Sequence, residues 1–222
     1  MIDIIKLSFM LTIISVAAAL LIAFTNLKTR DRIHEQQQVA QQNALEQVVP
    51  SGMSINECNG ENPPCPQQYW IAQDGTDTVF IFKIINKGYS GNITYFVGTD
   101  RNGSIEGMSI LEQSETPGLG SRTQEEISDK YFWNGLFSKK ETGKSWFSQQ
   151  FKGINLNEQI NIEKSVGEWH KLGMEEKEKL ISDNAVTAIT GATISTQAVV
   201  NGIQDQARSY LKAIQESNDD QG

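Results

Sequence analysis

The run Thr190-Gly191-Ala192-Thr193 places a threonine hydroxyl between a β-like segment and a long amphipathic helix. Apolar and β-branched residues fill most of positions 186–189, Gly191 permits a tight turn, and a helical pattern begins at about Thr193. The first N–H groups of a helix have no partner within it, and with the helix dipole they attract anions. The Thr193 hydroxyl could therefore hydrogen-bond a phosphate or become esterified to one. Threonine is also a common helix N-cap, and residue types alone favour that simpler role.

A second stretch with possible ligand contacts is Glu115-Thr116-Pro117-Gly118-Leu119-Gly120. One proline and two glycines predict a loop without regular backbone pairing, so its backbone can approach a ligand closely. Taken alone, such a loop is most often a turn with a solvated glutamate.

Together these stretches resemble the motifs of a known family. The segment from Thr190 to Thr196 resembles the flavinylation motif of the RnfG and NqrC membrane subunits, in which the second threonine carries FMN through a phosphoester bond. The loop at residues 115–120 resembles a second motif of these subunits, and Lys87-Gly88-Tyr89-Ser90-Gly91 is similar to the turn that precedes it. The three motifs occur in the family's order, and the Gly-Tyr-Ser-Gly form with the chain length favours RnfG over NqrC.

The resemblance implies that FMN is the cofactor and that Thr193 carries it covalently. It also implies that Glu115 and Thr116 hydrogen-bond the flavin, that two glycines let the backbone pass close to the ring, and that Leu119 covers it. The residues expected to bind FMN are Thr190, Gly191, Ala192, Thr193 and Ile194 of the motif, and Glu115, Thr116, Gly118, Leu119 and Gly120 of the loop.

One position departs from the family pattern. The flavin transferases that modify such proteins usually meet an aspartate three residues before the motif's first threonine, and here that residue is Thr187. Asp183 lies nearby but out of register.

Aromatic and apolar side chains between the two motifs have two possible roles. They either shield one face of the isoalloxazine from water, which alters the favoured redox state, or form core, the commoner role of aromatics. These side chains are Trp133, Leu136, Phe137, Trp146 and Phe147.

Several function classes are excluded. A formal net charge of −8, without clustered Lys and Arg, argues against a nucleic-acid surface. No Gly-x-Gly-x-x-Gly fingerprint is present, which argues against direct NAD binding. His34 and His170 are isolated, so we expect no catalytic residue and no metal site.

Residues 7–27 are uncharged and mostly apolar, and as a helix they would reach roughly 30 Å, the thickness of a bilayer core. We interpret them as a retained transmembrane anchor. A cleaved signal peptide is the alternative, because Ala17-Ala18-Ala19 would suit a peptidase. The apolar stretch continues too far beyond those alanines for a typical signal core.

Two sequence features disagree about the side of the membrane. Lys28, Arg30 and Arg32 follow the anchor, and the positive-inside rule would put the main domain in the cytoplasm. Cys58 and Cys65 lie in a proline-rich loop where a disulfide would be sterically easy, which suits the oxidising side, although two free thiols are equally compatible. The resemblance implies an extracytoplasmic domain on a single-pass anchor in the cytoplasmic (inner) membrane.

We expect an α+β fold in which a compact FMN-binding domain with a small antiparallel sheet and flanking helices follows the anchor. The predicted elements are a helix at 29–49, a loop at 50–70, strands at 78–85, 93–98 and 104–111 with a hairpin turn at 100–103, and helices at 124–131, at 174–181 and from 193 onward. The expected divisions are an anchor at 1–28, a helical stalk with the cysteine-containing loop at 29–76, the FMN-binding domain at 77–216 and a disordered tail at 217–222.

The resemblance implies an electron-transfer subunit of an Rnf-type ion-translocating ferredoxin:NAD oxidoreductase, without a complete active site of its own. Its partners would be the other membrane subunits and a flavin transferase that uses FAD and a divalent metal. Two alternatives remain open: an NqrC-like subunit of a sodium-translocating quinone reductase, and a membrane-anchored binding module of the same fold without flavin.

Overall fold

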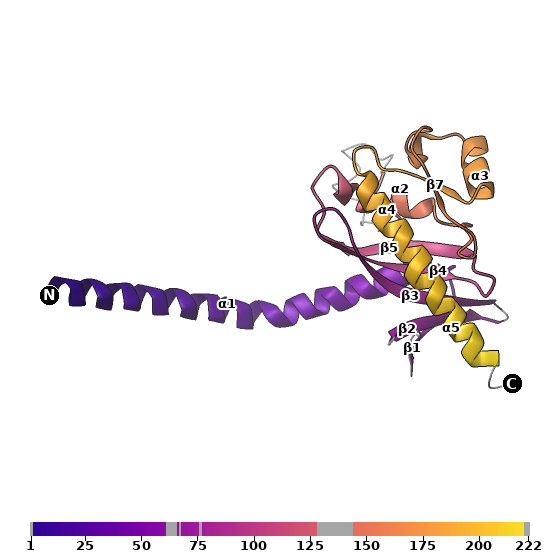
Figure 1. The fold of residues 1–222 in the computed structure, drawn as a ribbon. Helices are drawn as coiled ribbons and strands as arrows, with labels where there is room; N and C mark the ends of the chain where they lie inside the picture. Colours follow the sequence, from indigo (N-terminus) through magenta and orange to yellow (C-terminus); the bar gives the residue numbers. More distant parts are fainter. Residues whose placement is uncertain (1, 61–65, 67, 76, 128–143, 220–222) are drawn as a thin grey trace, which may run out of the picture. The chain divides into compact units, whose positions relative to one another are not determined.

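The computed structural model describes residues 2–60, 66, 68–75, 77–127 and 144–219 (Figure 1). The chain forms two compact units, Met1–Gln42 and Asn43–Gly222. The architecture is α+β, as the sequence predicts: a long N-terminal helix, then an antiparallel sheet with helices.

Helix α1 runs from Ile2 to Val48, so the predicted anchor and the predicted stalk helix are continuous. In the part of α1 that belongs to the first unit, the apolar side chains lie exposed, and Leu11, Leu20 and Leu21 are each about two-thirds exposed. Among the described residues, this is the one helix long and apolar enough to cross a membrane. A helix that satisfies its own backbone and presents apolar side chains all round is suited to lipid.

The second unit contains a five-stranded antiparallel sheet in which each strand pairs with the next along the chain. The three strands predicted after residue 77 are confirmed, and so is the turn between the last two. The Asp100 carboxylate accepts the N–H groups of Asn102 at 2.9 Å and Ser104 at 2.7 Å, and Gly103 has φ +86°. The strands are β1 Ser54–Asn59, β2 Gln68–Asp74, β3 Asp77–Lys87, β4 Asn92–Thr99 and β5 Ile105–Gln113.

Two local predictions were wrong. The stretch 50–70, predicted as a loop, contains β1 and the start of β2, so the sheet begins well before residue 77. Strand β1 is a polar edge strand whose only signal is its pairing with β2, from Ser54 opposite Gln73 to Asn59 opposite Gln68. At the start of the helix predicted at 124–131 the chain instead ends the 3-10 turn η1, Gly120–Gln124, continues with extended backbone at Glu125, and has no regular secondary structure through residue 127. The rest of that prediction lies outside the described residues.

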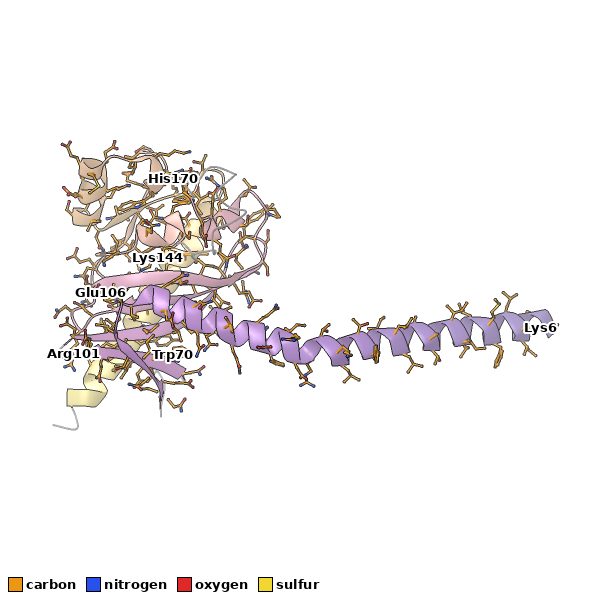
Figure 2. All side chains as sticks on the ribbon, turned by 180° about the vertical axis from the view of Figure 1, so that it is seen from behind. Lys6, Trp70, Arg101, Glu106, Lys144 and His170 are labelled. Atoms are coloured by element: carbon orange, nitrogen blue, oxygen red, sulfur yellow. The ribbon has the colours of Figure 1, made fainter. Side chains whose placement is uncertain are left out.

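The two faces of the sheet bury different partners, as the alternation along β3 requires. Phe80, Phe82 and Ile84 pack into the main core with the C-terminal helices, which cross this face diagonally in Figure 1. Val79 and Ile81 face a smaller core with Trp70, labelled in Figure 2, and with the last residues of α1. Because α1 ends in the sheet's own core, its last turn is fixed to the domain.

The remaining elements form a layer beyond β5 and lead to the C-terminal helices. Strands β6 and β7 pair in parallel. In chain order the elements are α2 Trp146–Gln149, β6 Asn161–Glu163, the 3-10 turn η3 Trp169–Lys171, α3 Met174–Ser182, β7 Ala185–Thr187, α4 Thr193–Gly202, the π-helical turn η4 Ile203–Ala207 and α5 Arg208–Asp219.

Candidate functional site

Three segments that are distant in sequence meet around a cavity of about 440 Å³ at one end of the sheet. Tyr89 comes from the turn between β3 and β4, residues 115–120 follow β5, and residues 191–195 form the turn into α4 and its first residues. Strand β5 ends opposite the start of β4, with Gln113 paired to Ile93, so both connections are brought to the same edge.

Thr193 is the first residue of α4, and the N-cap position belongs to Ala192. No side chain caps this helix start, so Thr193 does not act as the plain N-cap that residue types alone favour. The Thr193 side chain is half-buried against the cavity, and its hydroxyl has no hydrogen-bond partner among the described residues. Within the described part of the chain, a hydroxyl without a hydrogen-bond partner therefore stands at a helix N-terminus without a side-chain cap, where an anion is favoured.

The neighbouring hydroxyls of the motif are in different situations. The Thr196 hydroxyl accepts the Ile189 N–H at 3.1 Å and donates to the Ala192 carbonyl at 3.3 Å, which locks the turn into α4. The Ser195 hydroxyl is buried and donates to Glu115 at 2.6 Å. Thr190 has an exposed side chain that does not line the cavity. Thr193 is thus distinguished from them by geometry as well as by position in the motif.

Glu115 ties the three segments together. One carboxylate oxygen accepts the Ser195 hydroxyl, and the other accepts the N–H groups of Ser90 at 3.1 Å and Gly91 at 3.4 Å. Glu115 is only 7% exposed, so its carboxyl oxygens are held by these donors and not by water.

Two glycines are required by close approach. A Cβ on Gly120 would overlap the Glu115 carboxylate and the Ser195 hydroxyl. Gly191 has φ +79°, a conformation that L side chains rarely adopt, and a Cβ there would stand 3.1 Å from a Leu119 methyl group. The tight turn predicted at Gly191 is present, and it brings the 115–120 loop against the motif.

Most residues expected to bind a cofactor converge on this cavity. Those that line it are Glu115, Thr116, Leu119 and Gly120 of the loop and Gly191, Ala192, Thr193 and Ile194 of the motif. Gly118 and Thr190 are not among the lining residues. The structure adds Tyr89, which belongs to the Gly-Tyr-Ser-Gly turn, and Ser195, whose partner Glu115 is eighty residues away.

Trp146 and Phe147, weighed as flavin shields, lie in the main core and do not line the cavity. The Trp146 indole N–H donates to Glu125 at 2.9 Å. Trp133, Leu136 and Phe137 lie outside the described residues. Cys58 is half-buried in β1, and Cys65 lies outside the described residues, so a disulfide between them and two free thiols both stay alternatives from the sequence.

Thr187, which stands where the resemblance predicts aspartate, is fully buried. Its hydroxyl accepts the Trp169 N–H at 3.0 Å and donates to Gln150 at 3.0 Å, and its own N–H donates to Gln150 at 2.7 Å. This residue therefore fastens β7 to α2 and to the segment before α3.

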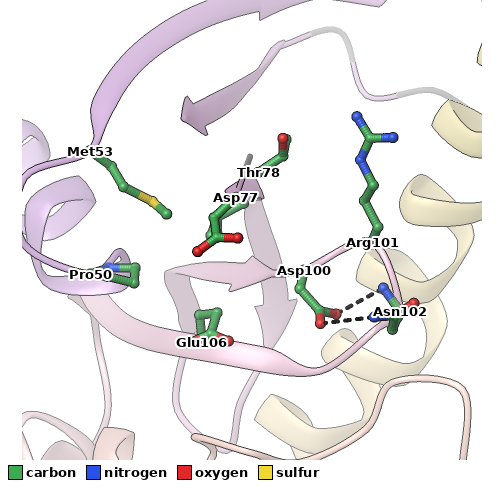
Figure 3. Close-up of a pocket in the computed structure, with 9 residues that line it drawn as sticks. Pro50, Met53, Asp77, Thr78, Asp100, Arg101, Asn102 and Glu106 are labelled. Carbon is green, nitrogen blue, oxygen red and sulfur yellow. Dashed lines mark hydrogen bonds between the residues drawn. The ribbon is translucent and has the colours of Figure 1, made fainter. Parts of the chain in front are cut away.

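A second cavity of about 390 Å³ lies at the opposite end of strands β3 to β5 (Figure 3). Asp77, Asp100 and Glu106 give it acidic walls, and the Asp100 carboxylate is bound to Asn102 of its own turn. No metal-ligand cluster is formed by the residues that the structure describes. Arg101 also lines this cavity, so three carboxylates stand against one guanidinium, whereas Glu115 is the one charged residue among the described residues that line the Thr193 cavity. The larger excess of negative charge disfavours a phosphate in the second cavity.

Comparison with known proteins decides the family. The model of the FMN-binding domain matches residues 88–208, which include all three segments around the Thr193 cavity. The chain belongs to the FMN-binding domain family. A second model, the RnfG N-terminal region, matches residues 1–48 of this FMN-binding domain protein.

Relatives of the protein cover most of its length. It is 30% identical over 196 residues to the G subunit of the ion-translocating oxidoreductase complex of Erwinia tasmaniensis, covering 83% of this chain and 79% of that protein. It is 26% identical over 219 residues to the G subunit of the Na(+)-translocating ferredoxin:NAD(+) oxidoreductase complex of Acetobacterium woodii, covering 92% and 90%. The crystal structure of the C subunit of Na(+)-translocating NADH-quinone reductase from Parabacteroides distasonis has a TM-score of 0.51 and 20% identity, covering 84% of this chain and 96% of that one. That structure shares the fold.

Proposed function

We propose that this protein is the G subunit of an Rnf-type ion-translocating ferredoxin:NAD oxidoreductase complex, and that it carries FMN as a phosphoester of Thr193. The observation that carries this proposal is the Thr193 hydroxyl in the cavity, which has neither a hydrogen-bond partner nor a capping side chain beside it among the residues that the structure describes, at the start of α4. Membership of the FMN-binding domain family identifies the cofactor class.

The attachment is a group transfer from FAD catalysed by a separate flavin transferase. The Thr193 oxygen forms a bond to the FMN phosphorus, the phosphoanhydride bond of FAD breaks, AMP leaves and the hydroxyl proton is released to solvent. No electron is transferred in this step. The divalent metal it needs belongs to the transferase.

The cavity suits both ends of FMN. Its volume lies within the usual range for ligand sites, about 300–1,000 Å³. The N–H groups at the start of α4 would receive the phosphate, and the apolar rim would lie against the isoalloxazine. Three exposed side chains form that rim: Tyr89, Leu119 and Ile194 are 69%, 44% and 57% exposed. The bound flavin would supply the redox chemistry, while the protein sets distance, orientation and local polarity.

The choice of complex is supported by the relatives and by the N-terminal helix. The RnfG N-terminal region matches residues 1–48, and the relatives named above are G subunits. An NqrC-like role has only the shared fold in its favour. As one electron carrier among other membrane subunits, this chain needs no complete active site of its own.

We place the domain on the extracytoplasmic side of the cytoplasmic membrane, following the family resemblance over the basic residues after the span. A covalent bond is useful there, because an extracytoplasmic carrier has no pool of free FMN to refill a reversible site. Sidedness can be tested with Lys152→Cys, an exposed position, in a chain whose own cysteines are replaced by serine. An impermeant maleimide should label intact cells, and labelling only after lysis would reverse the topology.

The cofactor proposal is tested by intact mass and in-gel flavin fluorescence under denaturing conditions, on protein from its own host. The native chain should gain one FMN less water and fluoresce, and Thr193→Ala should lose both signals. Ser182→Ala is the control, because this exposed hydroxyl lies outside the three motifs and does not line the cavity, and the variant should stay flavinylated. An unmodified native chain would favour the binding module without flavin.

A further inference from the structure

An ion pair with a buried carboxylate contacts the first residue of the Thr190–Thr196 motif. Glu168 precedes the turn η3, and its side chain is only 2% exposed. Its two carboxylate oxygens accept Arg122 Nη1 at 2.6 Å and Arg122 Nη2 at 3.1 Å, a bidentate pair. Such a pair fixes orientation as well as charge, because two parallel bonds define the angle between the groups.

The same carboxylate reaches the motif. The backbone N–H of Thr190 donates to Glu168 Oε1 at 3.3 Å. The backbone N–H of Trp169, the residue after Glu168, donates to the Thr187 hydroxyl. Two successive residues, Glu168 and Trp169, therefore hold the chain at Thr187 and at Thr190, which lie before and at the start of the turn that ends in Thr193.

Arg122 connects the Glu168 carboxylate to the loop at residues 115–120. It belongs to η1, which continues directly from the 115–120 loop, and its Nε donates to Glu125 at 2.9 Å. Its guanidinium also lies 5.8 Å from the centre of the buried Trp146 ring, within the range of a cation–π contact. One rigid unit thus joins the loop on one side of the cavity to the turn on the other.

We propose that Glu168, held by Arg122, is a positioning residue for flavin attachment: it fixes the Thr190–Thr193 turn against the 115–120 loop so that the Thr193 hydroxyl is presented to the transferase. It touches neither the hydroxyl nor the flavin phosphate in this role. The inference rests on Thr193 being the attachment site.

The test is a time course of flavin incorporation by intact mass, using full-length chain from a host without transferase, supplied with transferase, FAD and Mg²⁺. Glu168→Ala should slow incorporation by roughly tenfold or more, since a small misplacement of a reacting group has effects of that size. Glu168→Gln keeps an acceptor for the Thr190 N–H but loses the charge that pairs with Arg122. Its rate of flavin incorporation should therefore lie between those of wild type and Glu168→Ala. Lys171→Ala is the matched control: Lys171 binds the same carboxylate at 2.9 Å but is 65% exposed and does not touch the motif. Its rate should stay within about twofold of wild type.

A local readout separates positioning from general loss of structure. Hydrogen exchange of the Thr190 amide should speed up by about tenfold or more in Glu168→Ala, since its acceptor is gone. The Ile189 amide, bound to Thr196, should keep its protection. If Glu168→Ala fails to fold, Arg122→Met/Glu168→Met replaces the pair by apolar side chains of similar length, a change that buried ion pairs often tolerate. That double variant should be folded and slow to accept flavin.

The outcomes separate the two proposals. A wild-type chain that accepts no flavin on Thr193 contradicts the proposed function itself. A wild-type chain that is flavinylated, with a folded Glu168 variant modified at the same rate and an unchanged Thr190 amide, overturns the positioning role alone.

Discussion

Glu168→Gln should lower the free energy of unfolding by an amount that can be estimated from the surroundings of the carboxylate. The pKa of Glu168 is lowered from 4.5 to about 2, and the Arg122 hydrogen bonds are the largest cause. Burial opposes this shift, and the hydrogen bond from Lys171 adds to it. At ~1.36 kcal/mol per pH unit, the ionised carboxylate contributes about 3 kcal/mol of stability at pH 7. Glutamine keeps the shape but not the charge, so the variant should lose an amount of that order.

The pH dependence gives the sign of the effect. Because the pKa in the folded state is depressed, the contribution is fully present above pH 4.5 and is lost as the pH falls from 4.5 towards 2. The difference between wild type and variant should therefore fall to less than half between pH 7 and pH 3.

The assay is urea unfolding of the full-length chain in detergent, followed by tryptophan fluorescence, since Trp70, Trp146 and Trp169 are buried in the domain. Glu178→Gln, on the exposed side of α3, is the control and should change stability by less than about 0.5 kcal/mol. A loss of unfolding free energy below ~1 kcal/mol at pH 7, or a loss that does not change with pH, would refute the argument that the charge of the buried Glu168 carboxylate stabilises the fold.

Three further predictions concern the site and the core. Gly120→Ala should impair flavin incorporation, measured by intact mass, because its Cβ meets the buried carboxylate and hydroxyl beside the cavity, whereas Gly173→Ala, which has room for a Cβ, should be modified normally. Tyr95→Phe removes a buried 2.7 Å hydrogen bond to the Val199 carbonyl and should cost about 1–2 kcal/mol in urea unfolding; no loss would mean that the carbonyl's helical partners suffice. Phe82→Ala, in the main core, should cost roughly 3–5 kcal/mol in the same assay, and a loss under ~1 kcal/mol would contradict its burial.

Local patterns predicted the parts of the fold that local chemistry determines. The anchor helix, three strands of the sheet and the turn at Asp100 follow from apolar runs, alternation and Asn-Gly. Strand β1 could not be found in this way, because its residues are polar and its position depends on pairing with β2. The helix predicted after residue 124 failed for a similar reason: the Glu125 side chain bonds Arg122 and the Trp146 indole, and its backbone is extended.

The candidate site shows the same division. The turn at Gly191 and the helix start at Thr193 were predictable from residue types, and the resemblance drew attention to the loop at Glu115. The contact between Glu115 and Ser195, and the link from Glu168 to Arg122, span 80 and 46 residues, so no local pattern reveals them. Both are long-range polar contacts that exist only in the folded domain, and in our proposal they fix how the hydroxyl of Thr193 is presented.

The central claim is tested most directly by fragmenting the peptide that contains residues 190–196, from protein purified from its own host, and locating the FMN mass. The account predicts a phosphoester on Thr193, with Thr190, Ser195 and Thr196 unmodified. FMN on one of those other hydroxyls, or a peptide without FMN, would contradict it.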